Sequence, residues 1–173
     1  MTRRRALWIL GIATLVLFGV LAAIDRQMTK TGGPGIVGFE LARTSARAEE
    51  ILGQWGSSGR DAARASLWLD FLYLATYGAF LWLAVRALRD RLAQRGLDGL
   101  ARLGAFVGPL PLIGAACDAL EDVFLLLVLG GHRGSAPALA SAFASVKFAC
   151  LGIAVLYLLV GLLAARRAAE PAR

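Results

Sequence analysis

The stretch CDALEDVFLLLVLG, residues 117–130, places three carboxylates inside a run of apolar side chains. They are expensive there, because a charged side chain in mid-bilayer costs about 2.5–3.5 kcal/mol on insertion scales. The apolar segment around them nevertheless runs from Leu103 to Leu129, and a membrane span needs only about 20 such residues. Acids retained in a span normally face protein or water. Asp118, Glu121 and Asp122 are therefore expected to point into a helical bundle.

The rest of the chain repeats this apolar pattern. Of its 173 residues, 58% are hydrophobic, and they are concentrated in long segments separated by charged stretches. The segments that reach spanning length are 6–24, 66–85, 103–129 and 137–163. We therefore predict a single transmembrane domain over residues 1–173, an all-α integral membrane four-helix bundle.

The basic residues predict how the bundle is oriented. The net charge is +7, but the arginines cluster in short connections and at the termini, which argues for topology and against nucleic acid as a partner. The arginines that share one predicted side are Arg3, Arg4, Arg5, Arg86, Arg89, Arg91, Arg95, Arg102, Arg166, Arg167 and Arg173. By the positive-inside rule, both termini and the middle loop are cytoplasmic.

The first segment has a second interpretation, as a signal peptide. It begins with a basic stretch, and Ala22 and Ala23 follow its apolar part. That part is about 18 residues long, above the usual range of roughly 7–15 for a signal sequence, and it lacks a clear cleavage site. We expect a retained helix, although the sequence leaves cleavage of residues 1–23 open.

The first outer loop, residues 25–64, is the largest stretch outside the spans. Its FELARTSARAEEILGQWG (residues 39–56) mixes apolar and charged stripes and predicts an amphipathic helix lying on the outer surface. The alternative is a helix packed as a lid over the bundle. GPGIVG (residues 33–38) matches a dinucleotide-binding fingerprint literally, but no strand precedes it, so it carries no such meaning.

Polar side chains of three predicted spans converge at one depth. Counted at 1.5 Å per residue from the outer ends, Glu121, Asp118, Tyr73 and Lys147 lie roughly 12–17 Å deep. Lys147 is the expected counter-ion of Asp118 or Glu121. The residues predicted to bind a ligand are Asp70, Tyr73, Tyr77, Asp118, Glu121, Asp122 and Lys147. The alternative is a purely structural network that fixes helix register.

Most catalytic chemistries lack support in the sequence. G-x-S-x-G and H-E-x-x-H are absent, and His132 is the sole histidine, so haem and di-iron sites lack ligands. Lys147 argues against a metal ion among the carboxylates, and we expect neither a metal nor a cofactor. Cys117 and Cys150 are expected to be free thiols inside spans.

The stretches FELA, ILGQWG, SLWLDFLYLATYG and DALEDV resemble a group of small four-span bacterial membrane proteins without an established activity. The resemblance runs from about residue 35 to residue 147. It implies four helices in the bacterial inner membrane and transfers no catalytic residues.

The function favoured by these patterns is binding of a small polar or lipid ligand at the polar cluster, by a protein that is not an enzyme. Three alternatives stay open. One is a proton-coupled or oligomeric transporter or channel component, for which four spans would require a homo-oligomer. The others are a lipid-modifying membrane enzyme and a structural or assembly subunit of a membrane complex. Membrane lipids are the partners expected in every case.

Overall fold

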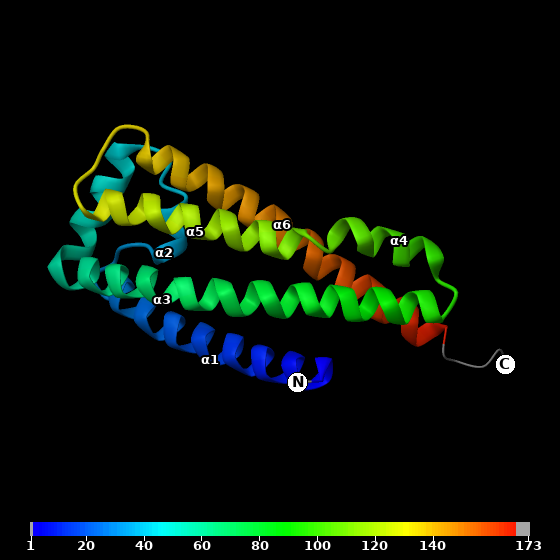
Figure 1. Ribbon diagram of the computed structural model, residues 1–173. Helices are drawn as coiled ribbons and strands as arrows, with labels where there is room; N and C mark the ends of the chain where they lie inside the picture. The colour runs from blue at the N-terminus through cyan, green and yellow to red at the C-terminus, as the bar shows by residue number, and fades with distance from the viewer. Residues whose placement is uncertain (1, 169–173) are drawn as a thin grey trace.

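The computed structural model describes residues 2–168, which form helices and no strand (Figure 1). The helices are α1 (Arg3–Thr29), α2 (Ile36–Glu40), α3 (Ser45–Gln94), α4 (Asp98–Val107), α5 (Leu110–Leu129) and α6 (Ala136–Arg167). The predicted all-α class is confirmed. Arg173, one of the arginines used to predict topology, lies outside the described residues.

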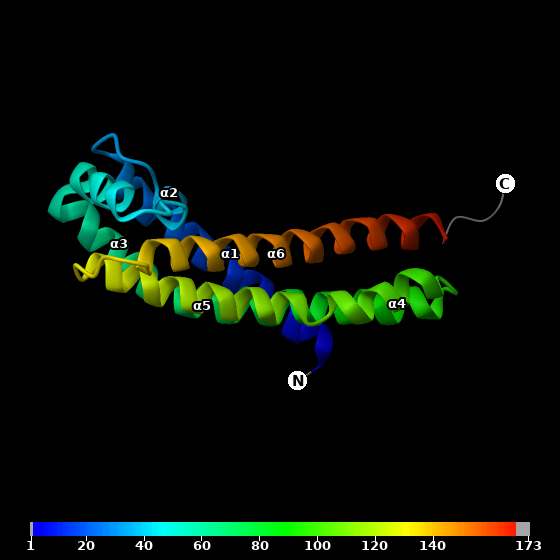
Figure 2. The same ribbon diagram turned by 90° about the horizontal axis from the view of Figure 1, so that it is seen from above.

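The long helices lie side by side and give the molecule an elongated shape (Figures 1 and 2). α1 packs along α3, α3 packs against α5, and α5 packs along α6. Within the described residues, α1, α3 and α6 are long and apolar enough to cross a membrane. α5 has 20 residues, about 30 Å of helix, and it carries the three carboxylates of the opening stretch.

A short cap closes the end of the bundle opposite the α3–α4 connection. We define the cap as α2 together with the part of α3 that precedes Gly56. Gly56 has φ 62° and ψ −164°, a backbone conformation that is essentially restricted to glycine. The helix axis breaks there, so that the first turns of α3 fold across the bundle end while the remainder runs along it (Figure 1).

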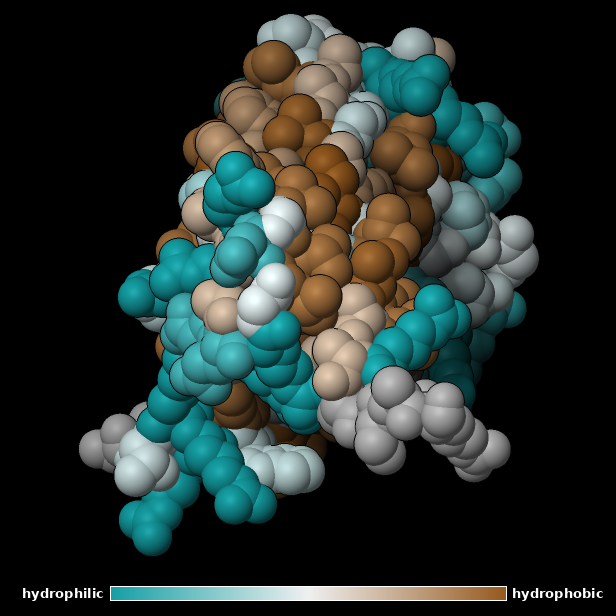
Figure 3. Space-filling model, turned by 90° about the vertical axis from the view of Figure 1, so that its right-hand side faces the viewer, coloured by the Kyte–Doolittle hydropathy of each residue, from teal (hydrophilic) through white to brown (hydrophobic). Residues whose placement is uncertain are grey.

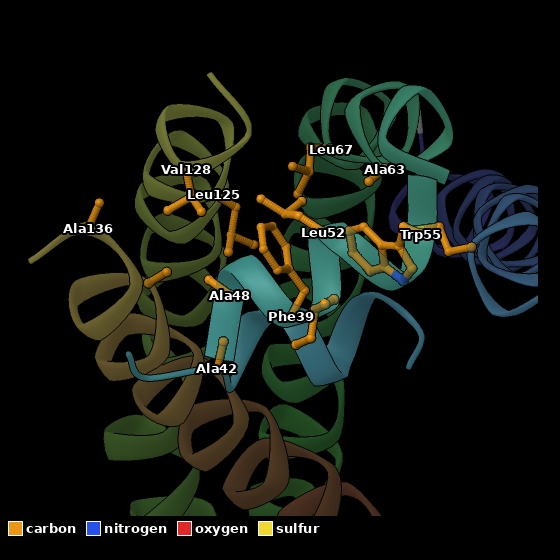
Figure 4. Close-up of a cluster of buried hydrophobic side chains, with 13 residues drawn as sticks. Phe39, Ala42, Ala48, Leu52, Trp55, Ala63, Leu67, Leu125, Val128 and Ala136 are labelled. Carbon is orange, nitrogen blue, oxygen red and sulfur yellow. The ribbon is translucent and has the colours of Figure 1, made fainter. Parts of the chain in front are cut away.

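The cap is held by apolar packing. Phe39 of α2 and Trp55 of α3 are almost fully buried, with ring centroids 5.0 Å apart. They pack with side chains of α3, α5 and α6, including Leu52 and Leu125 (Figure 4). The indole Nε1 of Trp55 also donates a hydrogen bond to the carbonyl of Pro34 at 2.7 Å. Burying each such large side chain stabilises the cap by roughly 1.5–3 kcal/mol.

The sequence predicted one amphipathic helix over residues 39–56, but the structure has two helices there. α2 ends at Glu40, and a new helix begins at Ser45 after Arg43 adopts a left-handed φ of 59°. The Thr44 side chain caps the new helix by accepting a hydrogen bond from the Arg47 N–H at 3.2 Å. The cap is a packed lid, because the apolar face of this helix is buried.

Prolines divide the third predicted span. α4 ends at Val107 and α5 begins at Leu110, because Pro109 has no N–H to continue the hydrogen-bond ladder. The sequence predicted a kink or loosening at Pro109 and Pro111, and the break confirms it.

The other end of the molecule is rich in charge. Arg3 donates a 2.8 Å hydrogen bond to Asp90, which joins the first turn of α1 to the last turns of α3. This bond lowers the pKa of the Asp90 carboxyl below its usual range. In the view onto this end, hydrophilic side chains gather in separate groups, and hydrophobic ones cover most of the surface between them (Figure 3).

Candidate functional site

Lys147, in the first half of α6, is surrounded by acids from two other helices. Its Nζ lies 2.8 Å from Asp118 Oδ1 and 2.8 Å from Glu121 Oε2, both on α5. The contact with Asp118 is a hydrogen bond, whereas Glu121 lacks the alignment for one and forms an ion pair. The ammonium side chain is only 8% exposed. The predicted pairing of Lys147 with these two acids is confirmed.

Asp118 has both carboxylate oxygens engaged. While Oδ1 accepts from Lys147, Oδ2 accepts a 2.7 Å hydrogen bond from the hydroxyl of Tyr77 on α3. Tyr77 can reach Asp118 because α3 and α5 approach closely at the neighbouring Gly78, where an added Cβ would come within 2.9 Å of the Ala115 side chain. A charge-assisted network of three side chains thus joins α3, α5 and α6.

The cap supplies a third acid that the sequence did not reveal. Glu40 Oε2 lies 3.4 Å from Lys147 Nζ, although the two residues are 107 positions apart. Burial raises the pKa of the Glu40 carboxyl, since the loss of water outweighs the attraction of Lys147. In the sequence, Glu40 is only an acid of the FELA stretch, outside every predicted span. Helical periodicity within the spans cannot place a residue of the loop that connects them.

A serine on α6 holds Glu40 in position. The Ser141 hydroxyl donates to the Glu40 carbonyl at 2.7 Å and accepts from the Arg43 N–H at 3.0 Å. The end of α2 and the loop after it are therefore fixed to α6 at a point six residues before Lys147.

Asp70 of α3 and Asp122 of α5 lie beside Asp118. Carboxylate oxygens of these three aspartates lie within 4.8 Å of one another, a spacing that could hold a cation. Asp122 is 3% exposed, and its Oδ2 has no hydrogen-bond partner. Asp118 is already engaged by Lys147 and Tyr77, so Asp70 and Asp122 would supply the free oxygens.

A cavity of about 750 Å³ opens next to these acids. It is enclosed by α1, α3, α5 and α6 and covered at one end by α2. Its walls away from the acids are apolar and include Phe18, Leu81, Leu151 and Val155. α1 packs along α3 without packing along α6, so the cavity reaches the surface of the molecule between α1 and α6.

The structure brings six of the seven predicted site residues to the cavity wall. Those six are Asp70, Tyr73, Tyr77, Asp118, Asp122 and Lys147. Glu121 is fully buried behind Lys147 and is not part of the wall. Its position is that of a counter-ion for the lysine rather than a ligand contact. Both cysteines are free thiols, as expected.

The chain matches no protein-family model, no curated protein and no solved structure.

Proposed function

We propose that the chain is a four-span integral membrane protein that binds a small polar or lipid ligand in the cavity between α1 and α6. The first support is the distribution of polarity. On α5, Leu120, Val123 and Leu127 are exposed, while Asp118, Glu121 and Asp122 are buried. Exposed apolar faces of this size are typical of contact with lipid or with another protein.

The other long helices have the same inverted pattern. α1 exposes Trp8, Ile12, Leu15 and Val16, and α6 exposes a row of apolar residues that includes Leu156. α1, α5 and α6 thus each expose several large apolar side chains, which supports α5 as a fourth span. We infer that both termini face the cytoplasm and that the cap lies on the outer side, from the arginines near α1, α4 and the end of α6. The resemblance described above supports our proposal that this membrane is the bacterial inner membrane.

One observation carries the binding proposal: a charged, water-excluding cluster forms one wall of a cavity whose other walls are apolar. A cavity with convergent polar groups and apolar walls is the usual form of a small-molecule site. Its opening between two membrane helices would admit a ligand sideways from the lipid. Lys147 and its acids hold the helices around the cavity, and Asp70, Tyr73 and Asp122 are left to contact the ligand.

Native mass spectrometry from a mild detergent tests this proposal, with a pair of α1 variants as a matched comparison. Ala22 lines the cavity, whereas Ala23 is exposed on the same helix and does not line it. We expect the wild-type protein and Ala23→Trp to retain a bound small molecule, and Ala22→Trp to lose it because the indole fills the cavity. A wild-type protein without a bound molecule, or equal retention by both variants, would contradict the proposal.

A further inference from the structure

The charges around the cavity do not balance. Glu40, Asp118 and Glu121 are each within 4 Å of the Lys147 ammonium. Asp70 and Asp122 have no cationic partner at this distance in residues 2–168. A carboxylate shielded from water without a partner is strongly disfavoured. Asp122 is buried and therefore requires a positive charge or a proton, and the half-buried Asp70 lies beside it.

The unpartnered oxygen of Asp122 identifies where that charge would sit. Asp122 is more than nine-tenths buried, and it lines the cavity together with Asp70. A group in the cavity could reach carboxylates from two helices at once, since oxygens of the pair lie within 4.8 Å. An anionic head group would meet the same acids and be repelled, because the Lys147 ammonium is already surrounded by three carboxylates.

Aromatic rings lie beside the two aspartates. Tyr73 and Tyr77 have ring centroids 5.1 Å apart, and Phe18 of α1 lies 6.4 Å from Tyr73 on its other side. All three rings line the cavity. Ring faces attract ammonium groups through their quadrupole, and aromatic rings next to carboxylates are the recurring way to bind them.

The cavity continues from this polar end into an apolar channel. Val155 of α6 lies eight residues beyond Lys147, about 12 Å farther along the helix, and it still lines the cavity. Leu81 and Leu151 lie between these levels. A ligand that fills both parts needs a polar head at one end and an apolar chain at the other.

We propose, building on the proposed function, that the ligand is an amphiphile with an ammonium head group. The head lies between Asp70 and Asp122 against the rings of Tyr73 and Tyr77. The chain extends between α1 and α6 toward Val155. The head group supplies the charge that the two aspartates lack, so one ligand completes the polar cluster and fills the apolar channel.

The test uses the full-length protein in mild detergent with three probes of equal chain length. Dodecylamine, dodecanol and dodecanoate are added at equal mole fractions, and adducts are counted by native mass spectrometry alongside the thermal unfolding midpoint. We expect dodecylamine to form a one-to-one adduct and to raise the midpoint, and the other two to do neither. Asp70→Asn/Asp122→Asn should bind dodecylamine at least about tenfold more weakly, a loss of about 1.4 kcal/mol.

The controls separate this inference from the proposed function. Asp61→Asn removes an exposed acid of α3 outside the cavity and should bind dodecylamine like the wild type. If dodecanol or dodecanoate binds as well as the amine, Asp70 and Asp122 hold protons, and the inference fails while ligand binding stands. If none of the three forms an adduct but a native lipid is retained, the inference again fails alone.

Two further outcomes bear on the inference. Stabilisation by Ca²⁺ or Mg²⁺ in place of dodecylamine would overturn it in favour of a metal ion at the aspartates. Should the double asparagine variant fail to fold, Tyr73→Leu replaces it, and it is expected to weaken amine binding without creating dodecanol binding. The comparison of head groups on the wild-type protein decides the question even without a variant.

Discussion

Lys147 is the residue on which the polar cluster depends, because its ammonium lies within 4 Å of three carboxylates. Removing a partner from a buried ion pair is costly, since the remaining charge stays desolvated. Tyr77 has a smaller and more easily measured role. Its hydroxyl is the second partner of Asp118 and connects α3 to the cluster.

Tyr77→Phe should lower the free energy of unfolding by about 1.5–3 kcal/mol, because it removes a buried hydrogen bond to a charged group. Tyr157→Phe is the matched control, since that hydroxyl donates to the neutral Leu100 carbonyl at 3.2 Å, and it should cost about 0.5–1.5 kcal/mol. Both values are obtained from chemical unfolding in mixed micelles. Equal losses in the two variants would mean that Asp118 gains little from the Tyr77 hydroxyl.

For single residues, the sequence predicted which side chains form the core of the polar cluster. It predicted less well which of them line the cavity and which other residues join the cluster. Helical spacing and depth were enough to bring Lys147 to Asp118 and Glu121, because residues on regular helices can be placed by counting. Counting could not distinguish the cavity wall from the layer behind it, so Glu121 was grouped with the ligand contacts. It also could not find Glu40, whose position depends on how a loop folds back.

Among the elements, the kink of α3 determines the shape of the cap. The φ and ψ of Gly56 lie where a Cβ clashes with the backbone, whereas Gly53, three residues earlier, is an exposed helical residue with open space around its Cβ position. The two glycines thus have opposite physical roles within one helix.

Gly56→Ala should destabilise the protein by about 1–3 kcal/mol, the cost of a strained backbone conformation. Gly53→Ala should stabilise it by about 0.5–1 kcal/mol, because alanine loses less conformational freedom in a helix. Thermal unfolding of the two variants in the same detergent measures the difference. A neutral Gly56→Ala would show that α3 can run straight and that the cap does not require the kink.

The helix boundaries show which breaks a sequence can reveal. Pro109 makes the break between α4 and α5 predictable from the sequence, because proline has no backbone N–H to donate. The break between α2 and α3 contains neither glycine nor proline, and it depends on the left-handed Arg43 and on contacts of Ser141 from α6. Local patterns cannot report a boundary that a distant helix imposes, and for that reason the cap was predicted as one helix.

For the molecule as a whole, the proposed orientation places the cap and the α5–α6 turn on one side of the membrane and the α3–α4 connection on the other. Figure 1 shows these regions at opposite ends of the long helices. The Arg3–Asp90 pair keeps the start of α1 at the same end as the α3–α4 connection, which agrees with a common cytoplasmic side for both.

Single cysteines in a Cys117→Ala/Cys150→Ala background test this orientation. Ser57→Cys and His132→Cys should react with a membrane-impermeant maleimide in spheroplasts, because both sites are exposed at the outer end. Gly99→Cys should react only after the membrane is permeabilised. Labelling of Gly99→Cys before permeabilisation would contradict the cytoplasmic position of the α3–α4 connection.

The pairing of α5 with α6 also constrains how the protein is made. α5 leaves the ribosome with three acids, each costing about 2.5–3.5 kcal/mol in lipid, and Lys147 is synthesised 25 residues after Asp122. If α5 is a span, as proposed, it would by itself be a poor substrate for the insertion machinery. In the proposed membrane protein, the short connection between Leu129 and Ala136 would let the two helices enter the bilayer together as a hairpin, with Asp118 and Glu121 already paired with Lys147.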